Sequence, residues 1–349
     1  MKRKKILYLD QFAVSNMYNA VPTSLWGQLR SIIIEKVNNR ILSCPMPLEH
    51  LYETLGRSNM GEDGNESIEY SKQIAQQHRF LSEIAKGTTF YGYEEIAAAE
   101  IMMLLRQGNV KPIQSMYFHK AYYADIEILD IYANGHKFNK DNHFYNQELF
   151  KDVNGLREDM KKAGQELSKP DKSLALDYLC KIQTRAYIEG LKELCRKGVV
   201  NVRGVQCGKI NIPNKVDWLL KLLCDKRLDK RLAQKLICEL ETHGFEKIPS
   251  MNIRSSLNAD MAVNGKSQTP NDVIDIDRAA IGLRISDYFF ADNEKKLAIE
   301  RCQLDKKYQT KIYSAKKKIC FVTNYGVVGI VNHSSFASKL QFPKGANFQ

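Results

Sequence analysis

The feature that most constrains this chain is a pair of short apolar runs, one near each end, that both stop at an aspartate. Ile6–Leu9 is followed directly by Asp10. The aromatic run Tyr288–Phe290 is followed, after one alanine, by Asp292. Runs of this length and composition predict buried strands. Because sites in an open parallel sheet form at the carboxyl ends of the strands, neighbouring strands would bring Asp10 and Asp292 to one edge.

An acidic stretch comes before the second apolar run. Asp272, Asp275 and Asp277 lie at the start of a segment with helical spacing, where the positive end of the helix dipole favours carboxylates. Clustered carboxylates repel one another unless cations neutralise them, and Mg²⁺ and Mn²⁺ prefer oxygen ligands. One interpretation is a divalent-metal site for phosphodiester chemistry. The other is that each aspartate only begins a turn or caps a helix.

A third group of candidate residues follows the predicted strand Ile41–Cys44. We expect a helix from about Leu48, on which Glu49 and Glu53 are four residues apart and can share one face. His50 lies beside them, either as a contact to a carboxylate or phosphate or as a half-buried, hydrogen-bonded histidine.

Three segments, in this order, resemble the motifs of PIN-like domain nucleases: YLDQF at the start, CPMPLEHLYET at Cys44–Thr54 and DIDRAAIGLRISDYFFADN near the end. In that family an acid ends the first strand, a second lies on a following helix, a third opens a late helix and a fourth ends the next strand. The resemblance covers about residues 4–105 and 270–325 and is patchy between them.

The resemblance implies a metal-dependent nuclease whose catalytic and metal-binding residues are Asp10, Glu53, Asp275 and Asp292, with Mg²⁺ or Mn²⁺ as cofactor. RNA is the expected substrate. Glu49 stays in reserve for Glu53, and Asp277 for Asp275. The alternative is a protein of the same fold that binds nucleic acid or a partner without catalysis.

Two departures from the family pattern favour that alternative. Arg278 stands where relatives often carry His, and Ala291 stands where they often carry Ser or Thr. Asp287 has a family-like place, but we expect it to be structural. It begins the strand that Asp292 follows, and an extended strand of this length separates the two by roughly 17 Å.

The expected fold class is α/β, with a mostly parallel sheet flanked by helices and a large helical insertion. The PIN-like core would be built from residues 1–106 and 270–330, the insertion from 107–269 and a C-terminal tail from 331–349. Within these limits, Lys86–Phe90 and the Asn-, Gly- and Ser-rich segment Ser255–Pro270 are predicted to be loops.

The composition of the chain limits the class of protein and the cellular setting that we expect. The chain has 349 residues, of which 44% are hydrophobic and 26% charged, as in soluble globular proteins. No apolar run approaches the roughly 20 residues of a membrane span, and the basic start lacks the apolar core of a signal peptide. The eight cysteines include no C-x-x-C pair, which argues against a zinc ribbon. Scattered cysteines in a chain without a signal peptide predict a reducing, cytoplasmic setting.

The net charge of +12 fits a polyanionic partner such as nucleic acid. The segment from Glu294 onwards carries eleven Lys or Arg and three Asp or Glu. A second basic group lies at Lys221–Lys235. Both are candidate contacts to a phosphate backbone, and the second is equally interpretable as a solvated helix face.

Overall fold

The structure, a computed structural model, describes residues 4–46, 76, 79–111, 118–120, 158, 161–166, 171–198, 200–201, 204–205, 228–266, 268, 270–314, 319–323 and 326–331. The helices are α1 (Gln11–Tyr18), α2 (Leu25–Asn38), α5 (Tyr93–Gln107), α9 (Lys172–Arg196), α11 (Lys230–His243), α12 (Pro249–Val263), α13 (Pro270–Gly282), α14 (Asn293–Arg301) and α15 (Leu304–Tyr308). The strands are β1 (Lys5–Leu9), β2 (Leu42–Ser43), β3 (Thr88–Phe90), β4 (Phe118–Lys120), β5 (Val200–Asn201), β6 (Gly204–Val205), β7 (Tyr288–Phe290), β8 (Lys311–Tyr313), β9 (Ile319–Thr323) and β10 (Gly326–Val331).

The centre of the fold is a parallel sheet of four strands in the order β2-β1-β7-β8. Leu7, Tyr8 and Leu9 of β1 pair with Tyr288, Phe289 and Phe290 of β7. The predicted sheet from both ends of the chain is therefore confirmed. The predicted closing strand at Thr310–Tyr313 joins this sheet as β8, whereas β9 pairs with β10 in a separate antiparallel hairpin.

Helices cover both faces of the sheet, which explains why β1 has no polar alternation. Ile6 and Tyr8 point into the core formed with α5, α12 and α13. Leu7 and Leu9 point to the other face, into a core formed with α1 and α2. Successive side chains of a strand alternate between faces, so a strand buried on both sides must be apolar throughout.

A close contact under the sheet fixes the position of α13. The ring of Tyr8 stacks on Phe289 with 4.5 Å between centroids and 3° between planes. Gly282, the last residue of α13, lies so near this ring that a Cβ on it would approach Tyr8 Cδ2 to 2.3 Å. The absence of a side chain at Gly282 thus lets the helix end against the strand that carries Asp10.

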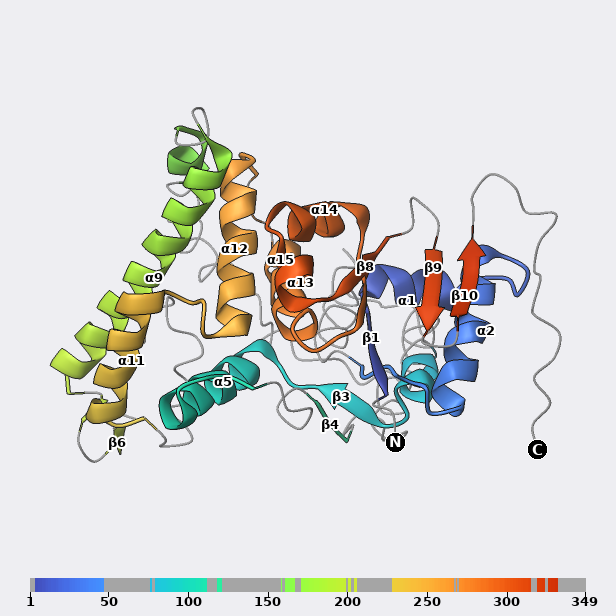
Figure 1. Cartoon of the computed structure of the whole chain (residues 1–349), viewed down its shortest axis with the longest axis horizontal. Coiled ribbons are helices and arrows are strands. Elements are labelled where there is room, and N and C mark those ends of the chain that lie inside the picture. Colours follow the sequence, from blue (N-terminus) through green and yellow to red (C-terminus); the bar gives the residue numbers. More distant parts are fainter. Residues whose placement is uncertain are drawn as a thin grey trace, which may run out of the picture.

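The helical part of the molecule lies beside the sheet. Figure 1 shows α9 and α11 side by side at one end, and α13, α14 and α15 next to the sheet. Helix α12 lies between these two groups. A buried carboxylate joins two of these helices. Glu100 of α5 is fully buried and accepts hydrogen bonds from the backbone N–H and the hydroxyl of Ser250, at 2.8 and 2.6 Å, in the first turn of α12. It therefore places an acceptor oxygen at the first turn of α12, where the backbone N–H groups have no partner within the helix.

Two of the predicted loops are wrong. Helix α12 runs through most of the segment Ser255–Pro270 and ends at Val263, followed by Gly265 with φ +66°. The Asn- and Ser-rich composition misled the prediction, because buried Leu257 and Ala259 place the apolar side of this helix against its neighbours. In Lys86–Phe90, only Lys86 and Gly87 form a turn, and Thr88–Phe90 is β3.

Candidate active site

Asp10 and Asp292 occupy equivalent places at the carboxyl edge of the sheet. Asp10 follows β1, its backbone N–H donates to the carbonyl oxygen of Phe290 at 3.1 Å, and its Oδ1 accepts from the N–H of Gln11 at 2.7 Å. Asp292 lies just beyond β7 and caps α14 by accepting from the N–H of Lys295 at 2.8 Å. Both residues are therefore helix caps, and both lie on the edge where sites form in parallel sheets.

Asp275 meets Asp10 through a buried arginine. Nη1 of Arg278 lies 3.4 Å from Oδ1 of Asp10 and 3.2 Å from Oδ1 of Asp275. The side chain of Arg278 is 3% exposed, against 11% for Asp10 and 26% for Asp275. Arg278 and Asp275 are three residues apart on α13, a spacing that puts them on one helical face. The two carboxylates thus share one cation, although their residues are far apart in the sequence.

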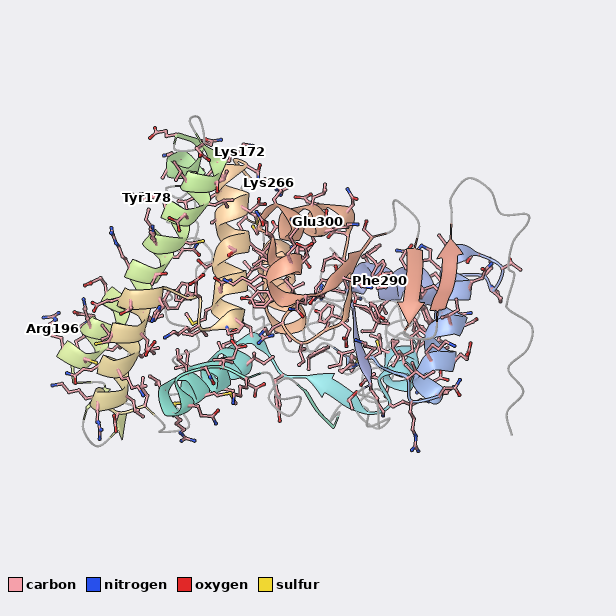
Figure 2. The ribbon with its side chains drawn as sticks, viewed as in Figure 1. Lys172, Tyr178, Arg196, Lys266, Phe290 and Glu300 are labelled. Atoms are coloured by element: carbon pink, nitrogen blue, oxygen red, sulfur yellow. The ribbon has the colours of Figure 1, made fainter. Side chains whose placement is uncertain are left out.

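A second cation, Lys295, connects this group to Asp292. Its Nζ lies 3.6 Å from Oδ2 of Asp275 while its backbone N–H is bound by Asp292. Asp275, Asp292 and Lys295 line a pocket of about 210 Å³, whose polar walls also include Asp260, Asp272, Glu294, Lys266 and Arg301. Figure 2 labels Lys266, just after α12, and Phe290, at the end of β7; in this view α13 and α14 lie between them. The pocket is therefore rich in both signs of charge.

The two other aspartates of this region have separate partners. Asp277 lies two residues beyond Asp275, on another side of α13, and its Oδ1 forms an ion pair with Arg254 of α12, 2.8 Å from Nε. Asp287 lies at the opposite end of β7 and binds Nζ of Lys5 at 2.6 Å and the N–H of Ile6 at 2.9 Å. The geometry favours Asp275 over Asp277 as the site residue, and Asp287 stands apart from Asp10 and Asp292, as predicted.

Burial raises the pKa of Asp10 from its ordinary value of 3.8 to about 6. Loss of water around the carboxylate is the largest cause, since desolvation penalises the charged form. The guanidinium of Arg278 is the strongest opposing influence, and Asp275 raises the pKa further. A charged Asp10 is thus costly in this fold unless cations surround it.

The metal-free protein is expected to lose stability as the pH rises from about 4 to about 6. The folded state binds the Asp10 proton more tightly than the unfolded state, so folding takes up a proton in this window and the free energy of unfolding falls with pH. A shift from 3.8 to about 6 corresponds to a loss on the order of 2–3 kcal/mol. Urea unfolding in chelator, from pH 4 to 8, measures it. Asp10→Asn should flatten the curve, and identical curves for the two proteins would contradict this prediction.

The donor chemistry of the group fits a divalent ion, but the described residues do not complete a metal centre. Asp10 and Asp275 bring together carboxylate oxygens, the ligands that Mg²⁺ and Mn²⁺ prefer, on either side of Nη1 of Arg278. Within the described ranges, no three His, Cys, Asp or Glu side chains are placed to hold one ion. The predicted ligand Glu53, with Glu49 and His50, lies outside the described residues.

The sequence indicates the acidic residues of this group but not the two cations, Arg278 and Lys295, that lie between them. Arg278 counted only as a departure from a family pattern, and Lys295 only as one of many basic residues near the C-terminus. The spacing of three residues between Asp275 and Arg278 was the available signal, since residues at this spacing are neighbours on a helix. No local pattern predicts that Arg278 also reaches Asp10, because that contact depends on how α13 packs on β1.

Comparisons of the chain with family models, with curated proteins and with solved structures find no match. Among the helices that the structure describes, none is long and apolar enough to cross a membrane.

Proposed function

We propose that this protein is a metal-dependent nuclease with a PIN-like carboxylate site, and that its substrate is RNA. The observation that carries the proposal is the meeting of Asp10 and Asp275 at the carboxyl edge of a four-stranded parallel sheet, where both contact Arg278. Asp292 stands at the same edge, one strand away. The fold class, the order of the acids in the chain and the motifs quoted above support the same proposal.

Asp10, Asp275 and Asp292, with Glu53, would hold Mg²⁺ or Mn²⁺. Such an ion, when bound, activates water and stabilises the leaving oxygen of an in-line displacement. The chain's own groups set the conditions for that chemistry. The backbone N–H groups of Gln11 and Lys295 orient the carboxylates of Asp10 and Asp292. Lys295 and Lys266 lie in the wall of the adjoining pocket, where they would face an incoming phosphate.

RNA binding is expected to weaken steeply with salt, because each phosphate contact releases counterions. Some of the basic residues that could bind the RNA backbone already form ion pairs within the protein. Near the C-terminus, Lys296, Arg301 and Lys307 form ion pairs with Glu300, Asp260 and Glu246. By contrast, Lys230 and Arg231 are exposed in the first turn of α11.

Replacing Lys230 and Arg231 together by alanine should lower RNA affinity and reduce the slope of log affinity against log salt by about two. Fluorescence anisotropy with labelled RNA from 50 to 300 mM salt measures both effects. Arg196→Ala is the matched control, because that guanidinium already binds Glu193 at 2.7 Å. Binding that does not change with salt would contradict the prediction.

One observation favours the second candidate, a protein of this fold that binds RNA or a partner without cleaving it. Arg278 and Lys295 already neutralise Asp275, and Arg278 also lies against Asp10. These two cations therefore compensate the charge of Asp275 without a metal ion. The two candidates differ in what the purified protein does to RNA.

The test is cleavage of labelled RNA by the full chain in Mn²⁺, Mg²⁺ or chelator, with single- and double-stranded DNA as competing substrates. Metal-dependent cleavage of RNA supports the nuclease. Salt-sensitive binding without cleavage supports the second candidate, and cleavage of DNA alone would overturn the choice of RNA.

A further inference from the structure

Arg301, the last residue of α14, is held in place by a carboxylate of another helix. Its Nε donates to Oδ1 of Asp260 at 2.8 Å, and its Nη2 donates to Oδ2 at 2.5 Å. Asp260 is buried in α12, and its Oδ1 also accepts from the side-chain amide of Asn264 at 3.1 Å. Because a carboxylate that binds a guanidinium through two parallel hydrogen bonds fixes its plane, Arg301 has a defined orientation.

This ion pair uses only one edge of the guanidinium. An arginine side chain carries five N–H donors, and Asp260 accepts from two of them. Among the described residues, no other group accepts a hydrogen bond from Arg301. Its side chain is 42% exposed and lies in the wall of the pocket that Asp275, Asp292 and Lys295 also line. The edge formed by Nη1 and Nη2 can therefore bind two neighbouring acceptors of a ligand.

The described wall of this pocket favours a neutral ligand over a phosphate group. Its acidic residues outnumber its basic ones, and the charged members are Asp260, Asp272, Asp275, Asp292 and Glu294 against Lys266, Lys295 and Arg301. The rest of this wall is apolar and consists of Leu257, Met261, Ile276 and Ala298. The volume of about 210 Å³ lies below the roughly 300–1,000 Å³ of sites for drug-sized molecules. A single nucleobase, with apolar faces and hydrogen-bonding edges, matches this size and chemistry.

The position of Arg301 relative to the carboxylates suits a base and a phosphate of the same strand. Lys295, which lies 3.6 Å from Asp275, is six residues before Arg301 on α14. This spacing separates the two basic residues by about 9 Å along the helix axis. A phosphate at the carboxylates and a base at Arg301 would therefore occupy separate parts of the site.

Guanine is the base whose edge best matches a fixed arginine. It presents two neighbouring acceptors, O6 and N7, whereas adenine presents one acceptor and one donor at the same edge. Its amino group is a donor that a carboxylate of the wall can accept. We propose that this pocket binds one unpaired guanine of the RNA next to the cleaved phosphate, that Arg301 recognises it, and that Asp260 is the positioning residue. The inference rests on the proposed function for its substrate class, RNA.

The experiment measures the affinity of the full chain for short oligouridines whose central residue is guanosine, adenosine, cytidine, uridine or an abasic ribose. Fluorescence anisotropy in chelator and in Ca²⁺ gives the affinities without Mg²⁺ or Mn²⁺. The parent should bind the guanosine strand about tenfold more tightly than each of the others. An abasic ribose keeps the phosphate and lacks the base, so this strand distinguishes a base contact from a phosphate contact.

Arg301→Lys should bind all five strands with similar affinity. Lysine keeps a positive charge beside Asp260, but an ammonium lacks the planar fork that binds two acceptors. Arg196→Lys is the matched control, because Nε and Nη2 of Arg196 also bind one carboxylate, that of Glu193, but Arg196 is not part of the pocket wall. This variant should keep the preference for guanosine.

The outcomes separate this inference from the proposed function. Equal affinity of the parent for the guanosine and abasic strands, or a preference for another base, would overturn the inference and leave the nuclease proposal standing. A guanosine preference that survives Arg301→Lys would do the same. A guanosine preference without cleavage of RNA in Mn²⁺ would support the inference and count against the nuclease. No binding of any strand would overturn both.

A second variant decides the matter if Arg301→Lys does not fold. Met261→Trp enlarges a half-buried side chain of the pocket wall and leaves the pair of Arg301 with Asp260 in place. Loss of the guanosine preference in this variant supports the inference, and an unchanged preference overturns it.

Discussion

Asp10→Asn is expected to lower Mn²⁺-dependent RNA cleavage by about 100-fold or more, and Asp292→Asn should have the same effect. Removing a residue that hydrogen-bonds to a metal ligand commonly lowers metal affinity or activity by about 10–100-fold. Removing a carboxylate that itself binds the ion should lower activity at least as much. An amide keeps the shape and the helix cap of Asp10, whose Oδ1 accepts from Gln11. The replacement removes the negative charge that the metal ion requires. Initial rates of cleavage at saturating Mn²⁺ measure the effect.

Loss of folding does not explain the expected loss of activity. Above pH 6 the charged form of buried Asp10 costs stability, so the neutral amide should leave the metal-free protein as stable as the parent or more stable. Added Mn²⁺ should raise the melting temperature of the parent more than that of either variant, because a ligand that binds only the folded state stabilises it. Thermal unfolding in chelator and in Mn²⁺ measures both effects.

Asp287→Asn is the matched control. It belongs to the same segment, but its carboxylate binds Lys5 at the opposite end of β7, and its loss should change stability without changing the cleavage rate per folded molecule. Full activity in Asp10→Asn would end the nuclease proposal in its present form. An equal loss in Asp287→Asn would show that the assay reports folding and not the site.

The central sheet could be predicted because its signals are local. Ile6–Leu9 and Tyr288–Phe290 are uninterrupted apolar runs, and a strand that is buried on both faces needs that composition. The rule that sites gather at the carboxyl ends of parallel strands then placed Asp10 and Asp292 on one edge. It also predicted that Asp287, at the other end of the same strand, would be structural.

The contacts between helices could not be predicted in this way. The local composition of Ser255–Pro270 predicts a loop. Most of this segment is instead helical, because α12 is stabilised by packing its buried side against α13 and α9. The ion pairs of Arg278 with Asp10, and of Arg301 with Asp260, join residues that only the folded chain brings together. Charge patterns along a sequence indicate which residues are basic, but not which of them are already neutralised.

The contact between Glu100 and Ser250 illustrates how much a contact between helices can contribute to stability. Glu100→Ala is expected to lower the free energy of unfolding by about 3 kcal/mol. The substitution leaves the N–H and the hydroxyl of Ser250, in the first turn of α12, without the carboxylate that binds them at 2.8 and 2.6 Å. It also empties a fully buried position in the core. Urea unfolding monitored by circular dichroism gives the value.

Two variants show whether the buried contact is the cause. Glu100→Gln retains an acceptor oxygen for Ser250 and should cost clearly less than alanine. Glu95→Ala, on the same helix, removes a half-buried cap that accepts from the N–H of Gly92 at 3.2 Å and should cost about 0.5–1 kcal/mol. Equal losses for Glu100→Ala and Glu95→Ala would mean that α12 does not depend on the buried carboxylate. A larger loss for Glu100→Ala would mean that α12 is held in place by a buried carboxyl group, a contact for which the sequence gives no local signal.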